Sequence, residues 1–513
     1  MLLRVPMPPR AYLLLGAVLL ATFLFRIPSL MEPPWYDDEG IYAAFGHALV
    51  RGAVPYRDVL DSRPPGIYWL YAWMLAASGY SVFFVKLTAT LSILGTQVAA
   101  FFFVRRLWGV RGALATSLLL GLIGSFPMLE GNIANAEIFM MLPTAMGMLL
   151  IATGRPFAAG VAFGVAFTIK QIAGVEFAAA LVAVAMFHPQ PKGTAGRLML
   201  GYALPLASMV AYLLSQNALS DFAYAGFGYY LHYIDREARL PGATVLVKLL
   251  LVFLSIVVVW WHHHGQREDA KFQRALPALW LAFAMFGALL TSRPYPHYLL
   301  QALTPLLVFV IPPLVAAWNR PLPRLTAGKV AAIAGLSMAV CWMFFTIYIP
   351  WPRWARIEKS VGYYQNFALY VTGARTAQAY NDFFDRRVNR NLTIASYMHR
   401  WARSGDRLLV LGEDPWMYPL TRLPLATPYV VYYYAYEMPS GVQRVIDAMS
   451  RQRPEYIMWT NGRVLNPDVK RELDRSYTEV LNVGNAVVYQ RSETLAQRRL
   501  AGGQGQPGFG ARP

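Results

Sequence analysis

Three consecutive carboxylates, Asp37, Asp38 and Glu39, follow the first long apolar stretch of the chain. Like charges this close together resist simultaneous ionisation, and a carboxylate can act as a general base. Two interpretations are open at this point. The acids either lie on a solvated loop without a role in chemistry, or they belong to a catalytic cluster, and the residues that follow favour the cluster.

The acids open a long segment, residues 31–80, that we expect to be a structured external loop. It contains the run Arg63-Pro64-Pro65-Gly66 and then an apolar stretch at 67–77. The two prolines fix backbone angles and the glycine permits a sharp bend, so the arginine is held in a set direction at the membrane surface. The same run could also simply turn the chain into an amphipathic helix at 67–77, and both interpretations can hold.

Further polar and ionisable residues recur at the ends of later apolar stretches. They are Asn135, Glu137, Lys170, Gln171, Arg293, Tyr295, His297 and Tyr298. Ionisable residues at span ends often serve only as interface anchors, and for any one of them that interpretation stays open. Their expected position on one side of the bilayer favours a shared role.

Acids beside bases at a membrane surface suit a reaction in which a hydroxyl loses its proton while an anionic phosphate leaves. A carboxylate would act as the general base. Arg63, Lys170, Arg293 or His297 would stabilise the charge of the departing phosphate. A divalent cation held by Asp38 and Glu137 could share this work, although no cofactor is required.

The composition shows what must position these residues. Of 513 residues, 56% are hydrophobic and only 14% are charged, which a soluble protein could not accommodate. The formal charge of +18 reflects Lys and Arg in short loops on the inner side, so we expect no nucleic-acid partner. The sequence predicts a polytopic α-helical protein of the plasma (inner) membrane, surrounded by membrane lipids.

About eleven apolar stretches are near the length that crosses a hydrocarbon core of about 30 Å. They lie at 11–25, 81–104, 112–128, 138–151, 157–169, 172–187, 198–215, 244–261, 275–291, 298–318 and 327–349. The first resembles a signal peptide, but an uncleaved span is favoured because no small-residue cleavage pattern follows. The stretch at 157–169 is short, and a tilted or re-entrant helix there would change the count by up to two.

The composition changes after the last stretch, which divides the chain into three parts. Residues 1–349 form the transmembrane module, residues 350–497 an extracytoplasmic α/β domain, and residues 498–513 a disordered tail. In the second part we expect strands at 407–411, 429–434, 456–459 and 486–489 and a helix at 442–451.

One motif in the first loop resembles a known signature. Asp38-Glu39-Gly40-Ile41-Tyr42, followed by Gly52, Pro55-Tyr56, Asp58 and Arg63-Pro64-Pro65-Gly66, is similar to the first loop of the polyprenyl-phosphate-sugar-dependent glycosyltransferases of the GT-C fold. The resemblance is greatest to the bacterial branch related to protein O-mannosyltransferases and the lipid A aminoarabinose transferase, and in topology it covers residues 1–349.

The resemblance implies roles for these acids. Asp38 falls where the family has its presumed catalytic base or acceptor-positioning residue, with Glu39 and Tyr42 as close neighbours. Asp37 is an extra acid that blurs this assignment. Glu137 falls on the second acidic position, where an Asp is common in the protein mannosyltransferases.

The resemblance also implies residues that bind the donor. Arg63 replaces the usual Lys before Pro-Pro, and its planar fork suits phosphate. Lys170-Gln171 and the segment at 293–298, which includes Arg293, His297 and Tyr298, resemble further family elements, the second as a contact for the lipid phosphate. Tyr42 and Asp61 complete the predicted substrate-binding set.

The implied reaction transfers one sugar from a polyprenyl-phosphate monosaccharide to an acceptor hydroxyl on the outer face, with inversion at the anomeric carbon. The acceptor could be a protein, a lipid or a cell-envelope glycan. Two rival hypotheses are a transporter or flippase of a lipid-linked sugar and a scaffold with a degenerate bundle. A transporter would favour ionisable sites near the midplane and an internal repeat, and the sequence shows neither clearly.

Overall fold

The computed structural model describes residues 7–229, 241–263, 268–290, 295–317, 357–460 and 464–501. The chain divides into two compact units. The helical unit comprises Met1–Glu32, Ser62–Ile67 and Phe83–Arg375, and the sheet unit comprises Pro33–Asp61, Tyr68–Val82 and Thr376–Pro513. Each unit therefore combines segments that are far apart in the sequence.

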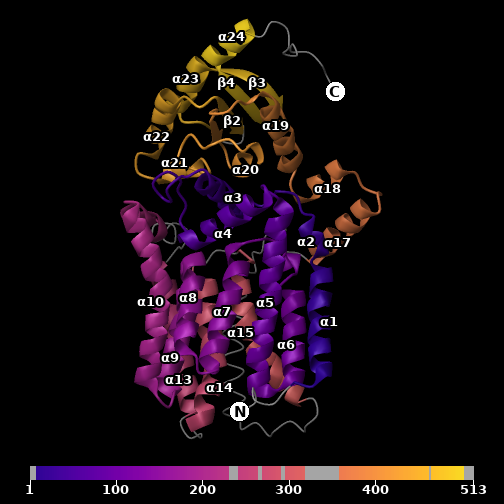
Figure 1. Ribbon diagram of the computed structural model, residues 1–513, viewed down its shortest axis with the longest axis vertical. Coiled ribbons are helices and arrows are strands. Elements are labelled where there is room, and N and C mark those ends of the chain that lie inside the picture. Colours follow the sequence, from indigo (N-terminus) through magenta and orange to yellow (C-terminus); the bar gives the residue numbers. More distant parts are fainter. Residues whose placement is uncertain are drawn as a thin grey trace. The chain divides into compact units, whose positions relative to one another are not determined.

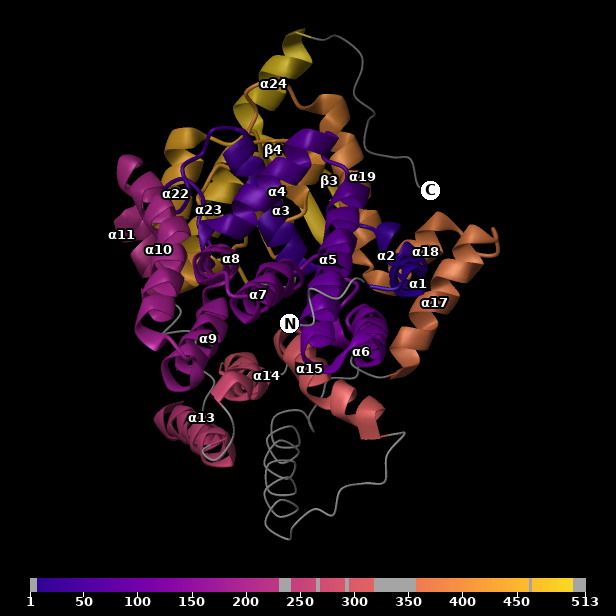
Figure 2. The ribbon, with the colours of Figure 1, turned by 60° about the horizontal axis from the view of Figure 1, so that its bottom comes forward.

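The helical unit is built mainly from apolar helices (Figures 1 and 2). Its helices are α1 (Pro9–Phe25), α2 (Ile27–Leu30), α5 (Val82–Trp108), α6 (Val110–Ile123), α7 (Ala136–Ala152), α8 (Pro156–Ile169), α9 (Gly174–Phe187), α10 (Pro191–Ser215), α11 (Leu219–Ala223), α13 (Pro241–His263), α14 (Glu268–Leu289), α15 (Tyr298–Ala317) and α17 (Ile357–Val371). Short helices η2 (Pro127–Leu129), η3 (Gln171–Ala173) and η4 (Tyr224–Gly228) lie between them.

Small residues let two of these helices pack closely. A Cβ atom on Gly160 of α8 would lie 2.1 Å from the carbonyl oxygen of Leu198, and one on Gly201 of α10 would lie 2.0 Å from that of Phe157. Only glycine leaves room for backbones this close, as is common between membrane helices. This contact holds α8 in place, and α8 leads directly into Lys170.

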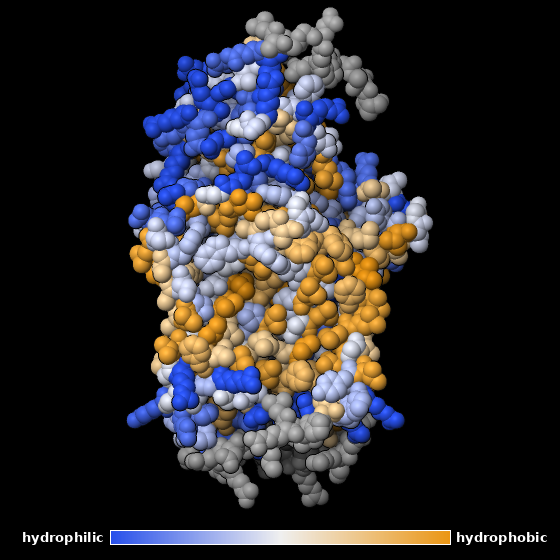
Figure 3. Space-filling model, viewed as in Figure 1, coloured by the Kyte–Doolittle hydropathy of each residue, from blue (hydrophilic) through white to orange (hydrophobic). Residues whose placement is uncertain are grey.

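The outer surface of the helical unit is suited to lipid. Hydrophobic side chains cover its helices on the face shown in Figure 3, and exposed residues include Leu13 of α1, Leu200 of α10 and Phe253 of α13. Helices satisfy their own backbone hydrogen bonds, so such a surface can face hydrocarbon. The prediction of a multi-pass helical membrane protein agrees with this surface.

The helices coincide closely with the apolar stretches of the sequence. Among the described residues four are long and apolar enough to cross a membrane, namely Val82–Trp108, Pro191–Ser215, Lys271–Leu289 and Tyr298–Ala316, and further apolar helices are shorter. The short stretch at 157–169 is indeed a helix of only 14 residues, α8. The predicted span at 327–349 lies outside the described residues, so the total of about eleven spans stays a prediction.

The sheet unit holds a mixed sheet of four strands in its described part. They are β1 (Leu408–Leu411), β2 (Tyr456–Thr460), β3 (Tyr477–Val483) and β4 (Ala486–Arg491), in the order β1-β2-β4-β3. β1 and β2 are parallel, and the other two pairs are antiparallel. β3 and β4 are joined by the two-residue turn Gly484-Asn485, where Gly484 has a φ of +60°.

Three of the four predicted strands are confirmed, and one is wrong. The run 429–434 contributes only a single bridge, from Tyr429 to Leu60, and then enters the short helix α21 (Tyr433–Glu437). Its aromatic residues are buried as core side chains, which gives a strand-like composition without strand pairing. β3 is missing from the prediction because it mixes polar and apolar residues and is mostly half-exposed or exposed.

Helices precede, separate and follow these strands in the sequence. They are α3 (Asp37–Val50), α4 (Pro65–Ser78), α18 (Ala377–Phe384), α19 (Arg387–Trp401), α20 (Met417–Thr421), α22 (Gly441–Asp447), η6 (Ala448–Gln452), α23 (Pro467–Ser476) and α24 (Ser492–Ala501). The helices at 442–451 and 67–77 are confirmed. The acidic run does not lie on an irregular loop, because Asp37, Asp38 and Glu39 form the first turn of α3. Carboxylates are favoured at that end of a helix by the helix dipole.

Candidate active site

The helical unit contains a buried ion pair between Lys170 and Glu137. The Lys170 ammonium group donates a hydrogen bond to the Glu137 carboxylate, and the two side chains are only 7% and 1% exposed. Two opposite charges stay buried at acceptable cost only when they are paired in this way. The two residues that the sequence placed in separate loops therefore meet.

Local backbone structure presents both groups. Glu137 lies in the first turn of α7, where the side chain of Asn135 caps the helix by accepting a hydrogen bond from the Ala136 N–H at 2.8 Å. Lys170 follows the end of α8 in an extended conformation, with φ −152° and ψ 123°. The break in the chain between α8 and η3 thus frees the lysine side chain to reach Glu137.

A second buried pair adjoins the first. Nδ1 of His297 pairs with the Glu130 carboxylate, and Nε2 of the same ring lies 3.8 Å from Oε1 of Glu137. Glu130 adopts a left-handed backbone conformation, with φ +55°. Its contact fixes the orientation of the imidazole and directs the other ring nitrogen toward Glu137.

Tyr298 and one oxygen of Glu137 complete the cluster. The ammonium of Lys170 lies 4.7 Å from the centre of the Tyr298 ring, within the range of a cation–π interaction. Among the described residues, Oε2 of Glu137 has no hydrogen-bond partner although it is buried. A buried carboxylate oxygen of this kind can accept a hydrogen bond from a ligand hydroxyl.

The Arg63-Pro64-Pro65-Gly66 run packs in the same unit. The side-chain amide of Gln171 donates to the carbonyl oxygen of Ser62 at 3.2 Å. A Cβ on Gly66 would lie 2.5 Å from the carbonyl oxygen of Thr168. The run therefore lies against the turn that carries Lys170, and the Arg63 side chain is half-buried there.

The acidic turn of α3 belongs to the sheet unit. Asp38 is half-buried and Glu39 is fully buried. Burial raises the pKa of the Tyr71 hydroxyl well above its usual value, and the charges of Glu39 and Asp38 raise it further. Tyr71, on α4, therefore lies close to both carboxylates.

Two further predicted site residues lie inside the sheet unit. Tyr42 is fully buried, and its ring packs against those of Tyr71 and Tyr68 with centroids 5.4 and 6.2 Å away. Asp61 is also fully buried and accepts hydrogen bonds from the hydroxyls of Tyr68, at 2.5 Å, and Tyr434. Both residues connect helices of this unit, and their predicted contact with substrate stays a prediction.

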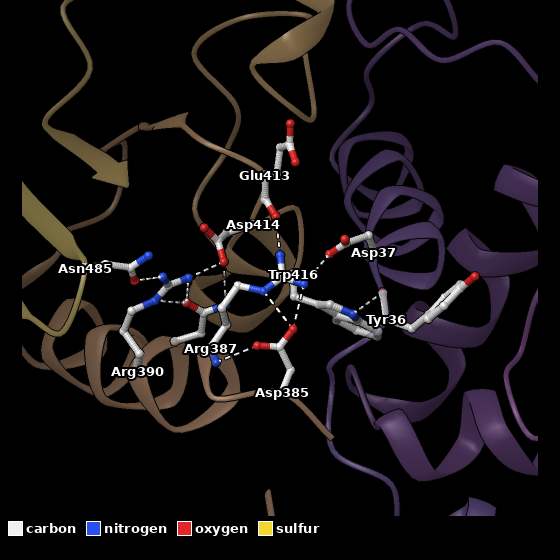
Figure 4. A network of polar contacts seen from close by, with 10 residues as sticks. Tyr36, Asp37, Asp385, Arg387, Arg390, Glu413, Asp414, Trp416 and Asn485 are labelled. Atoms are coloured by element: carbon white, nitrogen blue, oxygen red, sulfur yellow. Dashed lines mark hydrogen bonds and ion pairs between the residues drawn. The ribbon is translucent and has the colours of Figure 1, made fainter. Parts of the chain in front are cut away.

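Asp37 forms an ion pair with Arg387, a residue from the last part of the chain. This partner was not predicted from the sequence. One oxygen of the Asp37 carboxylate lies 3.0 Å from Nη2 of Arg387 (Figure 4). The Asp37 side chain is 52% exposed. Burial raises its pKa to about 6, Arg387 opposes this rise, and Asp414 and Asp38 add to it.

The helical unit thus brings together Glu137, Lys170, His297 and Tyr298 and the run that contains Arg63. Glu130 belongs to this cluster and was missed, and the only signal for it was an acid at the start of the same short loop as Glu137. Asp38, Glu39, Tyr42 and Asp61 lie in the sheet unit. Arg293 lies outside the described residues.

No set of three or more His, Cys, Asp or Glu side chains in the described part of the chain is arranged to hold a metal ion. The divalent cation at Asp38 and Glu137 stays a prediction.

Comparison with known proteins gives a result at the level of structure. No protein-family model matches the chain, and no curated protein matches it in sequence. The crystal structure of ArnT from Cupriavidus metallidurans bound to undecaprenyl phosphate matches with a TM-score of 0.57 and 16% identity, over 93% of this chain and 97% of that one. The apo state of the same protein matches with a TM-score of 0.55 and 18% identity, over 94% and 98%.

A weaker match is the archaeal oligosaccharyltransferase AglB from Archaeoglobus fulgidus in complex with an inhibitory peptide and a dolichol-phosphate. Its TM-score is 0.47 and its identity 9%, over 95% of this chain and 74% of that one. The match to ArnT extends over 97% of that protein. The chain has the GT-C fold of the lipid A aminoarabinose transferase ArnT, as the motif in residues 38–66 predicted.

Proposed function

We propose that this protein is a membrane glycosyltransferase. It moves a monosaccharide from a polyprenyl-phosphate donor to an acceptor hydroxyl at the outer face of a bacterial plasma membrane. The observation that carries the proposal is the buried cluster of Glu137, Lys170 and His297 in a chain that shares the fold of ArnT. The solved ArnT structure holds undecaprenyl phosphate, the chemical class of the proposed donor lipid.

The reaction requires one bond to form as another breaks. The acceptor oxygen bonds to the anomeric carbon from the face opposite the phosphate, the carbon–oxygen bond to phosphate breaks, and polyprenyl phosphate leaves. Asp38 takes the proton of the acceptor hydroxyl as general base. Inversion at the anomeric carbon follows from this single displacement.

The basic groups serve the leaving phosphate. Lys170 and His297 are already fixed by carboxylates, so they need little rearrangement when negative charge develops on the phosphate. Arg63 lies on the run packed beside the Lys170 turn, and its fork can bind two phosphate oxygens. Glu137 holds Lys170 and keeps one oxygen available for a donor hydroxyl.

The alternative of a transporter is less favoured. A transporter would favour an interrupted helix near the midplane, but the short stretch at 157–169 is the ordered helix α8, packed closely on α10. The break after α8 brings Lys170 into contact with Glu137. The shared fold with ArnT favours transfer over transport.

The test is sugar transfer by the purified protein in nanodiscs. Radiolabelled polyprenyl-phosphate monosaccharides are supplied with a total membrane extract as acceptor, and wild type is compared with Asp38→Asn and Glu137→Gln. Asp474→Asn is the matched control, because that carboxylate is exposed and pairs only with the neighbouring Lys470 on α23. We expect transfer by wild type and the control, and none by the other two.

If labelled lipid crosses the bilayer while no tested donor loses its sugar, the transporter hypothesis replaces this proposal. Transfer that persists unchanged in Asp38→Asn would remove Asp38 from the role of general base.

A further inference from the structure

The first turn of α3 is held by two side chains from the last part of the chain. The indole N–H of Trp416 donates to the carbonyl oxygen of Tyr36 at 2.9 Å. Nη2 of Arg387 lies 3.0 Å from Oδ1 of Asp37. All four residues belong to the sheet unit. The backbone just before the acidic run and its first side chain are thus both fixed from outside α3 (Figure 4).

Arg387 is itself firmly oriented. Its Nε donates to Asp385 at 2.9 Å, Nη1 donates to the carbonyl oxygen of Glu413 at 2.9 Å, and Nη2 lies 2.8 Å from Asp385. A guanidinium group has its donors in one rigid plane, so these contacts set the direction of the contact to Asp37. The fork is therefore prearranged to receive the carboxylate.

A second layer supports this arrangement. Arg390 pairs with Asp414 and with Asn485, and Asn391 also donates to Asp414, at 3.2 Å. Asp414 is only two residues from Trp416, and Arg390 is one helical turn from Arg387 on α19. The paired residues fix the two elements that reach α3 relative to each other (Figure 4).

The contact at Trp416 includes the helix backbone. A Cβ on Gly40 would lie 2.7 Å from Cδ1 of Trp416 and 2.8 Å from Cγ of Pro415. Glycine at this position of the Asp38-Glu39-Gly40 run lets the ring lie directly on the first turn. A shift of Trp416 would therefore move the turn that carries Asp38 and Glu39.

We propose that Arg387 and Trp416, from the last part of the chain, are positioning residues for Asp38 and Glu39. This inference rests on the proposed function. Neither residue needs to touch substrate, because both act through Asp37 and the backbone of Tyr36. Small displacements of a catalytic group from its working geometry can reduce rates by about 10²-fold.

The electrostatics of Asp37 agree with this arrangement. Arg387 from α19 is the cation that faces Asp37, while Asp414 and Asp38 are the facing anions. Burial and these anions raise the pKa of Asp37 to about 6, and Arg387 opposes the rise. Loss of Arg387 would therefore favour the neutral form of Asp37 and remove the contact that fixes the turn.

The experiment compares three variants of the full-length protein in nanodiscs with one control. Arg387→Gln removes the ion pair, Arg387→Lys keeps the charge without the fork, and Trp416→Phe removes the indole N–H and part of the ring that packs on Gly40. The control is Arg498→Gln, which breaks another partly buried pair of the same unit, with Asp406 at 3.1 Å. The partners of Arg498 in the described part of the chain are Trp401, Asp406, Glu455 and Tyr456, so this variant should lower thermal stability without acting through α3.

We expect kcat to fall about 10²-fold in Arg387→Gln, with partial rescue in Arg387→Lys, a fall of about tenfold in Trp416→Phe, and an unchanged donor KM. Arg498→Gln should keep the wild-type kcat. Because Arg387 acts through Asp37, adding Arg387→Gln to Asp37→Asn should cause little further loss. A merely structural role of Arg387 would instead give additive losses.

Hydrogen exchange of the amides of residues 37–42 provides a second readout that does not need activity. Exchange should become faster in Arg387→Gln and Trp416→Phe and stay unchanged in Arg498→Gln. Wild-type kcat and wild-type exchange in both variants would overturn the inference while the proposed function stands. Absence of transfer in wild type itself would overturn the proposed function, and faster exchange without any transfer would leave Arg387 and Trp416 a structural role only.

Discussion

Lys170 and Glu137 form an ion pair inside the helical unit, with side chains that are 7% and 1% exposed. The lysine comes from the break between α8 and η3, and the glutamate from the first turn of α7. Because the pair is buried, the stability of the fold suffers when only one partner is removed and the other charge stays behind.

Breaking this pair should destabilise the protein more than removing it entirely. Glu137→Gln leaves the Lys170 charge buried without its partner, which costs about 3–5 kcal/mol in comparable buried pairs. The double variant Glu137→Gln with Lys170→Met should recover part of this loss. Thermal unfolding in detergent measures both, and a double variant less stable than the single one would contradict the prediction.

His297 should be needed for departure of the phosphate. His297→Phe should lower the rate of transfer about 10²–10³-fold, as expected when one preorganised donor to a developing anion is lost. Glu130→Gln should lower it less, because the imidazole stays but loses the carboxylate that orients it. Transfer assays in nanodiscs check both, with His399→Gln, an exposed histidine of α19, as control.

Asp61 should contribute to stability through its two tyrosines. Each hydrogen bond to a charged group contributes about 1.5–3 kcal/mol, so Tyr434→Phe should reduce the free energy of unfolding of the sheet unit by that amount. The effect should shrink in an Asp61→Asn background. Tyr436→Phe is the control, since its hydroxyl makes only contacts of 3.1–3.4 Å at an exposed position. Equal losses in both backgrounds would refute the coupling.

His47 should make the sheet unit sensitive to acid. Nε2 of His47 donates to the carbonyl oxygen of Leu423 at 3.0 Å, which leaves Nδ1 to accept from the Tyr80 hydroxyl at 2.9 Å. Burial lowers the pKa of His47 to about 4, the bond to Leu423 opposes this, and Arg51 and Arg422 add to it. The folded ring therefore stays neutral where the unfolded one binds a proton.

The sign of the effect follows from this difference. Between pH 6.5 and about 4 the unfolded state binds a proton that the folded state does not, so stability should fall as pH decreases, by on the order of a few kcal/mol. Asp37 acts in the opposite direction, because its raised pKa removes stability as pH rises from 3.8 to about 6. The Asp37→Asn variant removes this opposing effect, so its free energy of unfolding is measured between pH 6.5 and about 4. Adding His47→Gln to this variant should make the free energy of unfolding nearly independent of pH in this range.

The sequence predicted the helical unit well because each of its helices is a local feature. An apolar stretch in lipid must satisfy its own backbone groups, so length and composition decide the element. The same reasoning named Glu137, Lys170 and His297 as candidates, since ionisable residues at the ends of such stretches are conspicuous, and the structure brings these three together. Glu130 escaped because a single acid in a short loop has no local sign of its buried histidine partner.

The sheet unit was harder because its structure depends on distant pairing. The strand β3 has a mixed composition and pairs with β4. The tyrosine-rich run at 429–434 is largely buried without forming a strand. Arg387 and Trp416 could not be predicted as partners of the acidic turn, because some 350 intervening positions separate them from Asp37 in the sequence. Contacts of this kind leave no periodic pattern.

The sheet unit is assembled from segments at both ends of the chain, with residues 83–375 between them. During biosynthesis, α3 and α4 must wait for their partners until nearly the whole protein has been made. At elongation rates of about 5–20 residues per second, that delay is on the order of tens of seconds. Over this time the buried surface of these helices is without its cover, so the nascent chain is a natural client for chaperones on the side of the membrane where this unit folds.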